Sequence, residues 1–175
     1  GLLLSDKGKA KESVASFRHA LSLQPNNVGF HINLGKVFKR LGELPKAIIC
    51  FRNALAINPN YAEAYVSLGM ALKDHDSHEE AIGCFQKAIA VKQELAEAYN
   101  CLAGTFWEMG EIEDALVNYR KAVACKPDYA VAHSNLLYAL NNIPGVSQKE
   151  IYREALQWSR QHADSLPALS ADYKN

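Results

Sequence analysis

The sequence predicts an all-α solenoid of antiparallel helix pairs. Two observations predict it: a 34-residue repeat, and helix-like apolar spacing within each repeat. Several residue types recur at one or two of these periods. They are Phe17, Phe51, Phe85 and Tyr119; Ala20, Ala54, Ala88 and Ala122; Gly8, Gly42 and Gly110; and Pro25, Pro59 and Pro127. A repeat of this length is typical of solenoids, in which each unit buries its apolar face only against its neighbours.

One repeat, at 28–61, shows how each unit is expected to fold. Each half places apolar or small side chains on one stripe at helical spacing. Gly42 lies between the two stripes, where a tight turn requires a left-handed residue. Pro59 follows the second stripe and cannot continue a helix, and we expect Asn60 to cap the next helix. Each unit is therefore predicted to be two antiparallel helices joined by a short turn.

Small and large residues at fixed places should fit the helices together. Gly35 and Gly69 lie where the first helix of a pair should approach the second closely. A bulky side chain there would cost about 1–3 kcal/mol through overpacking. Phe51 and Phe85 are expected to fill the space between successive units.

This pattern resembles the tetratricopeptide repeat (TPR). The repeat at 62–95 carries the family signature of an aromatic residue, Leu-Gly, Ala, Phe and Ala in order. These residues are Tyr65, Leu68, Gly69, Ala81, Phe85 and Ala88. The resemblance implies a right-handed superhelical solenoid, whose first helices line a concave groove that holds extended peptides or partner proteins.

The repeat boundaries divide the chain into six segments. They are 1–27, the second helix of a partial TPR; 28–61, 62–95 and 96–129, complete TPRs; 130–163, a degenerate TPR or capping helices; and 164–175, a tail or linker. Gln93 replaces the proline that ends other repeats, so the second helix of the 62–95 repeat is free to run on. In the last helix, Ser147 and Glu150 form a predicted capping box.

Residues turned away from the core on the first helices form the candidate binding site. The groove residues are Asn33, Lys36, Lys39, Arg40, Ser67, Met70, Lys73, Asn100, Trp107, Asn135 and Tyr138. Asn33 and Asn135 share one column, with Ser67 and Cys101 between them, and an amide side chain can hydrogen-bond a peptide backbone. The lysines and the arginine suggest a basic patch for acidic peptides. For both groups the alternative is an ordinary solvated surface. Ile32 and Val66 are also expected to face away from the core.

The C-terminal part resembles a junction found in bacterial and plant-like protein O-linked N-acetylglucosamine transferases, where the repeats meet the catalytic domain. The resemblance rests on His133-Ser-Asn-Leu-Leu-Tyr-Ala-Leu140 and Trp158-Ser-Arg-Gln-His-Ala163. The amide column also resembles the inner surface of those enzymes. This implies that the chain is the substrate-recruiting repeat region of a nucleotide-sugar-dependent protein glycosyltransferase. No catalytic residue of that family falls on these residues.

Composition and motifs exclude several other functions. The 175 residues include 19 Lys plus Arg and 19 Asp plus Glu, a balance that argues against general nucleic-acid binding. No apolar run approaches the roughly 20 residues of a membrane span. No phosphate loop, dinucleotide fingerprint or nucleophile motif is present, so we expect no cofactor and no enzymatic activity from this fragment. The chain begins with Gly1 and shows no signal peptide, which suggests an excised fragment or a processed chain.

Histidine and cysteine residues offer weaker signals. His75 and His78, with Asp74 and Asp76, have a spacing that zinc can use. Asp76, however, holds the turn position that glycine fills elsewhere, so we interpret the cluster as solvated turn residues and expect no metal site. The four cysteines form no CxxC pair, and we expect them to be reduced, which favours a cytoplasmic location.

Four functions therefore remain open. The first is an interaction scaffold for proteins or extended peptides, attached to a glycosyltransferase. The second is a stand-alone TPR adaptor or co-chaperone module, although such a clamp needs Lys and Asn where Ile32, Val66 and Met70 are apolar. The third is a self-contained enzyme. The fourth is a scaffold that associates end to end through Leu2, Leu3 and Leu4.

Overall fold

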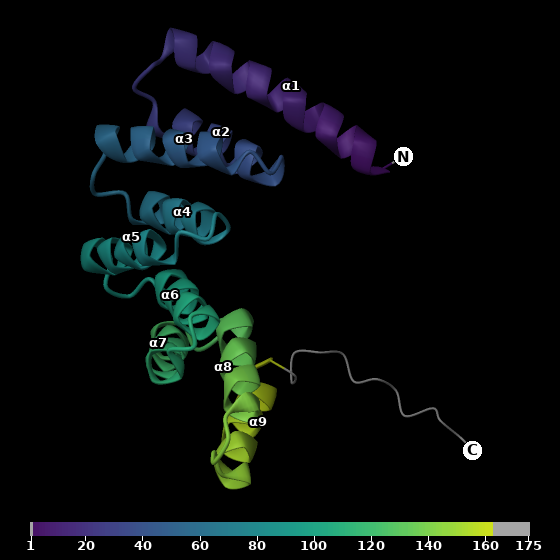
Figure 1. Cartoon of the computed structure of the whole chain (residues 1–175), viewed down its shortest axis with the longest axis vertical. Coiled ribbons are helices and arrows are strands. Elements are labelled where there is room, and N and C mark those ends of the chain that lie inside the picture. The colour runs from purple at the N-terminus through teal and green to yellow at the C-terminus, as the bar shows by residue number, and fades with distance from the viewer. Residues whose placement is uncertain (1, 163–175) are drawn as a thin grey trace.

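The computed structural model describes the backbone of residues 2–162 and the side chains of residues 8–149 and 151–160. The expected 164–175 tail, the side chains of the apolar start and the Glu150 half of the capping box lie outside these residues. Within 2–162 the chain forms nine helices and no strand, which stack into an arc (Figure 1). The helices are α1 (Leu2–Leu23), α2 (Val28–Arg40), α3 (Leu44–Ile57), α4 (Ala62–Lys73), α5 (His78–Val91), α6 (Ala96–Glu108), α7 (Ile112–Cys125), α8 (Ala130–Asn142) and α9 (Gln148–His162).

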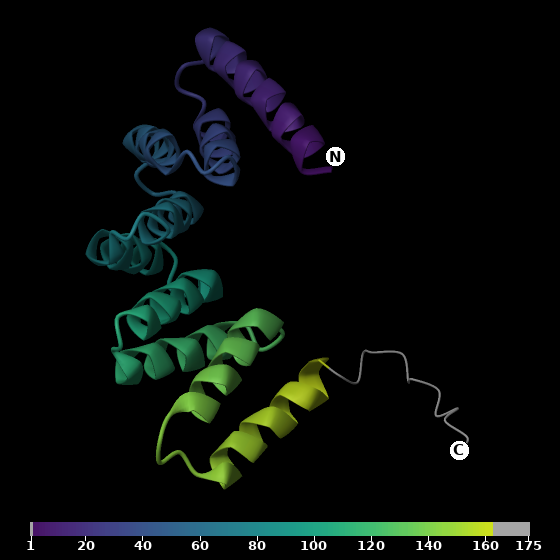
Figure 2. The ribbon, with the colours of Figure 1, turned by 45° about the vertical axis from the view of Figure 1, so that its right-hand side comes forward.

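The helices pair as the repeat predicts, and the all-α solenoid is confirmed. The first helices α2, α4, α6 and α8 begin 34 residues apart, and so do the second helices α3, α5 and α7. In the arc, α4 and α6 lie toward the concave side, and α5 lies on the outer side (Figure 2). Each first helix contacts the next first helix as well as the second helix of its own pair. The first helices therefore form a continuous layer on the inner side.

Each turn within the three complete TPR pairs contains one residue with a left-handed backbone. This residue is glycine in two of the turns and aspartate in the third. The φ angles are 77° at Gly42, 81° at Gly110 and 61° at Asp76. The interpretation of Asp76 as a turn residue is therefore confirmed. Gly8 shares the column of Gly42 and Gly110 but makes no turn, because α1 runs straight through it.

The connections between repeats differ from two sequence expectations. Asn60 does not cap α4, since the N-cap residue is Tyr61 without a side-chain hydrogen bond. The backbone N–H of Asn60 instead donates to Oδ1 of Asn58 over 3.1 Å, which closes a local turn. The second helix α5 does not run on despite Gln93. It ends at Val91, and Lys92 has nearly the same extended conformation as Asn58 in the preceding repeat. The helix therefore ends at the place equivalent to Ile57 of α3, although the proline is absent.

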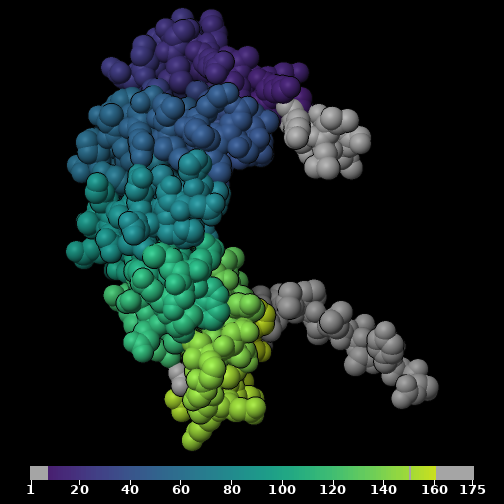
Figure 3. Space-filling model, viewed as in Figure 1, coloured from purple at the N-terminus to yellow at the C-terminus, as the bar shows by residue number. Residues whose placement is uncertain are grey.

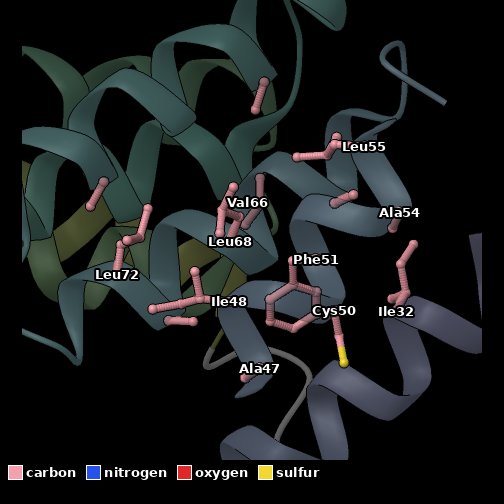
Figure 4. Close-up of a cluster of buried hydrophobic side chains, with 14 of the residues drawn as sticks. Ile32, Ala47, Ile48, Cys50, Phe51, Ala54, Leu55, Val66, Leu68 and Leu72 are labelled. Carbon is pink, nitrogen blue, oxygen red and sulfur yellow. The ribbon is translucent and has the colours of Figure 1, made fainter. Parts of the chain in front are cut away.

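The close approach expected at the glycines is present. A Cβ atom added at Gly35 would lie 2.6 Å from Cε1 of Phe51, and one at Gly69 would lie 2.6 Å from Cε1 of Phe85. Both rings are fully buried. Figure 4 shows Phe51 inside a cluster that includes Ile48 from α3 and Val66 from α4. The ring therefore joins the two helices of its own pair and also reaches the next repeat.

The C-terminal end closes with the α8–α9 hairpin. Residues 143–147 connect the two helices and include Gly145 with φ of 89°. His133 of α8 is fully buried, and its Nε2 lies 2.7 Å from Oε1 of Glu154 on α9. Ile151 of α9 packs against the second apolar cluster. Among the described helices, none has the length and apolar character that crossing a membrane requires.

Replacing Gly69 with Leu should lower the free energy of unfolding by at least about 1–3 kcal/mol, because the new side chain would collide with the Phe85 ring. Urea or thermal unfolding followed by circular dichroism measures the loss. Gly83→Leu is the matched control, since a Cβ there meets no atom within 4 Å. Equal stability of the Gly69→Leu variant and the wild type would show that the helix-pair contact has been misread.

Candidate functional site

The inner side of the arc carries two hollows between the first helices. The C-terminal hollow has a volume of about 420 Å³ and is lined by Met70, Lys73, Asp74, Phe85, Asn100, Cys101, Gly104, Trp107, Glu108, Tyr119, Asn135 and Tyr138. The N-terminal hollow has a volume of about 290 Å³ and is lined by Lys36, Lys39, Phe51, Glu63, Val66, Ser67, Met70 and Glu97. Because Met70 lines both, the hollows form one groove from α2 to α8. Figure 3 shows the molecule curved around this open side.

The structure places most of the expected groove residues in these two hollows. Six of them line the C-terminal hollow: Met70, Lys73, Asn100, Trp107, Asn135 and Tyr138. Lys36, Lys39 and Ser67 line the N-terminal hollow together with Met70. Asn33 and Arg40 are exposed on α2 but line neither hollow. Their part in binding stays a prediction.

Two apolar residues were assigned to the wrong face. Ile32 is 6% exposed and Val66 is 3% exposed, so both belong to the core. They lie on the sides of α2 and α4 that touch neighbouring helices, and these contacts bury them. Ile32 lines neither hollow, and Val66 lines the N-terminal hollow with only a small exposed area, so neither is a main determinant of the ligand. Any argument against a co-chaperone clamp has to come from the charged residues.

Two of the four predicted cations are held by carboxylates of the following repeat. Lys39 Nζ lies 3.1 Å from Oδ2 of Asp74, and Lys73 Nζ lies 2.8 Å from Oε1 of Glu108. The other oxygen of Glu108 lies 3.4 Å from Nε2 of His78. Partly exposed pairs of this kind add at most about 1 kcal/mol to stability. They nevertheless compensate the positive charge on which the basic-patch interpretation depended.

A pair of amides replaces the expected amide column. Nδ2 of Asn135 donates to Oδ1 of Asn100 over 3.0 Å, which joins α8 to α6. The hydroxyl of Ser67 donates to the backbone oxygen of Glu63 over 2.9 Å, within its own helix. Asn33 lies three repeats before Asn135, so the two cannot act at one point of a ligand. The Asn100–Asn135 pair keeps one N–H₂ group and one carbonyl oxygen beyond their mutual hydrogen bond.

Aromatic and sulfur-containing side chains form the apolar part of the C-terminal hollow. The ring centroids of Trp107 and Tyr138 lie 6.0 Å apart at an interplanar angle of 66°. Tyr138 is 62% exposed and presents its ring to the groove. Met70 and Cys101 are each partly buried beside them. This half of the groove offers contact area rather than charge.

Gly104 is a groove residue that the sequence reasoning missed. It lines the C-terminal hollow at the position that Lys36, Met70 and Tyr138 hold in the other first helices. The signal was present in the sequence, since those three residues are spaced at multiples of 34 and the column has one vacant place. From the sequence alone, a glycine at that position cannot be told from an ordinary helix residue, because the positions of the neighbouring side chains are not known. The missed acids Asp74 and Glu108 follow Lys39 and Lys73 by 35 residues.

The histidine and cysteine clusters do not form a reactive centre in the described part of the chain. No group of three or more His, Cys, Asp or Glu residues there could hold a metal ion. Nδ1 of His78 lies 3.2 Å from the backbone oxygen of Asp76, within the turn. The four cysteines are free thiols. Burial, assisted by the nearby Glu97 carboxylate, raises the pKa of the Cys101 thiol to about 11.

The helix pairs and the inner groove define a TPR solenoid. Comparison with known families then gives a more specific assignment. Residues 7–125 match the model of the cilia and flagella-associated protein 70 middle TPR-like domain, and the chain belongs to that family. No curated protein sequence matches the chain.

Solved structures agree on the fold. The crystal structure of the MamA protein superposes with a TM-score of 0.77 and 28% identity, covering 94% of this chain and 91% of that one. MamA from Desulfovibrio magneticus RS-1, from residue 41 to its end, gives a TM-score of 0.76 at 18% identity, covering 93% and 90%. An O-GlcNAc transferase mutant from Thermobaculum terrenum gives 0.69 at 22% identity, covering 77% of this chain and 26% of that one. The resemblance to TPR regions, including that of an O-GlcNAc transferase, is confirmed at the level of fold.

The Cys101 thiol should react slowly with iodoacetamide although it lines the groove. With a pKa of about 11, only about 0.1% of the thiol is ionised near pH 8, and the rate should rise about tenfold per pH unit toward pH 11. Mass spectrometry of variants that keep Cys101 or Cys125 alone measures both rates. The more open Cys125 should react faster, and urea-unfolded samples should react equally. Equal rates in the folded proteins would contradict the burial of Cys101.

Proposed function

We propose that this chain is a protein-interaction scaffold that holds an extended peptide segment in the groove formed by α2, α4, α6 and α8. The observation that carries the proposal is the continuity of the groove. Two hollows share Met70 and run across successive first helices. Small metabolites are usually bound in enclosed pockets, whereas an open groove that crosses successive helices suits an extended peptide.

The groove supplies the two kinds of contact that an extended peptide needs. The Asn100–Asn135 pair supplies donors and an acceptor for the peptide backbone. Met70, Trp107 and Tyr138 supply apolar contact for a side chain. A co-chaperone clamp for acidic peptides is less well supported, because Lys39 and Lys73 already bind Asp74 and Glu108.

The finer proposal is that the scaffold recruits substrates for a protein O-glycosyltransferase domain of the same protein. Its support is the sequence of 133–163, since the structural likeness to an O-GlcNAc transferase concerns the fold alone. The family to which the chain belongs is named for a protein of cilia and flagella, which makes a ciliary adaptor the competing assignment. Sequencing the transcript beyond the codon for Asn175 decides between them. A nucleotide-sugar-binding domain there supports the glycosyltransferase, and any other continuation or a stop codon counts against it.

End-to-end self-association is a separate proposal that concerns the solenoid's ends rather than its groove. Sedimentation at increasing protein concentration tests it. A constant monomer mass would reject it and leave the groove proposal intact.

Replacing Asn100 and Asn135 together by Ala should weaken peptide binding about tenfold or more, because two backbone contacts of about 0.5–1.5 kcal/mol each are lost. The peptides are those enriched from a random phage-displayed library on the wild-type protein, and fluorescence anisotropy measures their affinity. Helix content should not change, since both members of the amide pair are removed. Asn53→Ala, at an exposed position on α3, is the matched control. Equal affinity for all three proteins would reject the groove as the binding site.

A further inference from the structure

We propose that the space over Gly104 is an anchor pocket for one bulky apolar side chain of a bound peptide, and that it selects peptides with no acidic residue beside that anchor. The proposal rests on the peptide-binding function proposed above and specifies its ligand. It follows from the glycine itself, from the walls around it and from the charges beside it.

The glycine is not explained by packing or by backbone geometry. At Gly35 and Gly69 an added Cβ would come within 2.6 Å of a phenylalanine ring, so those helices need glycine. At Gly104 the nearest atom to an added Cβ is the Tyr119 hydroxyl oxygen at 3.7 Å, an ordinary contact. Gly104 also lies inside α6 and is not among the residues with positive φ. Glycine within a helix is less stable than alanine, so a residue that the fold does not require points to a function.

The missing side chain produces the hollow. The innermost column of the first helices reads Lys36, Met70, Gly104 and Tyr138. Side chains project at both neighbouring places, and between them the column is empty. The gap opens into the hollow of about 420 Å³, so a ligand side chain can occupy the place that a residue of α6 leaves free.

The walls of this gap are suited to an apolar or aromatic anchor. Trp107 and Tyr138 meet edge to face at 6.0 Å, with Tyr138 exposed at 62%. Met70 and the protonated thiol of Cys101 complete the apolar walls. Bulky side chains buried against aromatic walls carry most of the energy of peptide recognition. The Asn100–Asn135 pair lies in the same hollow, where it can bind the peptide backbone next to the anchor.

The charges beside the gap disfavour acidic ligands. Two carboxylates, Asp74 and Glu108, and one cation, Lys73, line the C-terminal hollow, and the ion pair of Asp74 with Lys39 brings the sum of these charges to zero. Lys73 is bound to Glu108, and Lys39 approaches from the next hollow to bind Asp74. A carboxylate of the ligand would therefore meet lysines that are already paired with carboxylates, and no net positive charge would attract it.

The first test fills the gap. Gly104→Met should fold at least as stably as the wild type and should weaken the binding of library-selected peptides about tenfold or more. Gly83→Met is the matched control, because Gly83 lies in α5 with no atom within 4 Å of an added Cβ. If Gly104→Met does not fold, Gly104→Ala adds one methyl group at ordinary contact distance and should give a smaller loss. Undiminished affinity in a folded Gly104 variant overturns the anchor pocket.

The second test changes the peptide. Three synthetic forms of the most enriched peptide are compared: the parent, one with its apolar anchor replaced by Ala, and one with Glu on both sides of the anchor. Wild-type protein should bind the parent about tenfold or more tightly than either changed form. Equal binding of the Ala form removes the anchor, and equal binding of the Glu form removes the charge selection.

The third test reverses the charge preference. Asp74→Asn with Glu108→Gln releases Lys39 and Lys73, and the double variant should bind the Glu-flanked peptide about tenfold more tightly than the wild type does. Glu80→Gln, which releases Arg52 from its 2.9 Å ion pair between α3 and α5, is the control and should not change binding. An unchanged affinity in the double variant would contradict the charge argument.

The outcomes separate this inference from the function on which it rests. If no library peptide distinguishes wild type from the Asn100→Ala, Asn135→Ala variant, the proposed function fails. If peptides make that distinction but bind Gly104→Met normally, or are enriched in acidic residues, the function stands and the anchor pocket fails.

Discussion

The contact between a glycine of one helix and a phenylalanine ring of its partner is the constraint on which this structure depends. At Gly35 and Gly69 the ring of Phe51 or Phe85 occupies the space where a Cβ would lie. This fixes how closely the two helices of a pair approach, and the same buried ring reaches the next repeat. This contact occurs in two successive repeats, and in the third complete repeat Ala103 and Tyr119 hold the same places in the second apolar cluster. The pairs therefore stack in register, and the first helices form the inner side of the arc.

Stacking in register brings together residues that are one repeat plus one position apart. Lys39 meets Asp74, Lys73 meets Glu108, and Asn100 meets Asn135 across successive first helices. Two lysines of the groove are therefore already paired with carboxylates of the groove before a ligand binds. What it presents is an amide pair and an aromatic wall, which favour shape and backbone recognition over attraction of an acidic peptide.

Several rules that rest on a single residue type failed to predict the local backbone. Asn60 is of a residue type that often caps helices, yet its backbone N–H donates to the side chain of Asn58 in a local turn. Gln93 removes the proline signal, yet α5 ends at Val91, as the repeat requires. Gly8 lies in the column of the turn glycines Gly42 and Gly110, yet α1 continues through it. In each case the preference of one residue type did not fix the backbone.

The sequence by itself determined the period, the helices and the columns that face the groove, since apolar spacing and recurring glycines depend only on residues near in the chain. Nine of the eleven groove residues expected from the sequence line the two hollows, whereas Asn33 and Arg40 are exposed on α2 and line neither. Tertiary structure alone decided that Ile32 and Val66 are core, that two lysines are compensated, and that Gly104 leaves a gap. These features depend on distances between side chains of different repeats, and no pattern within a single helix specifies such distances.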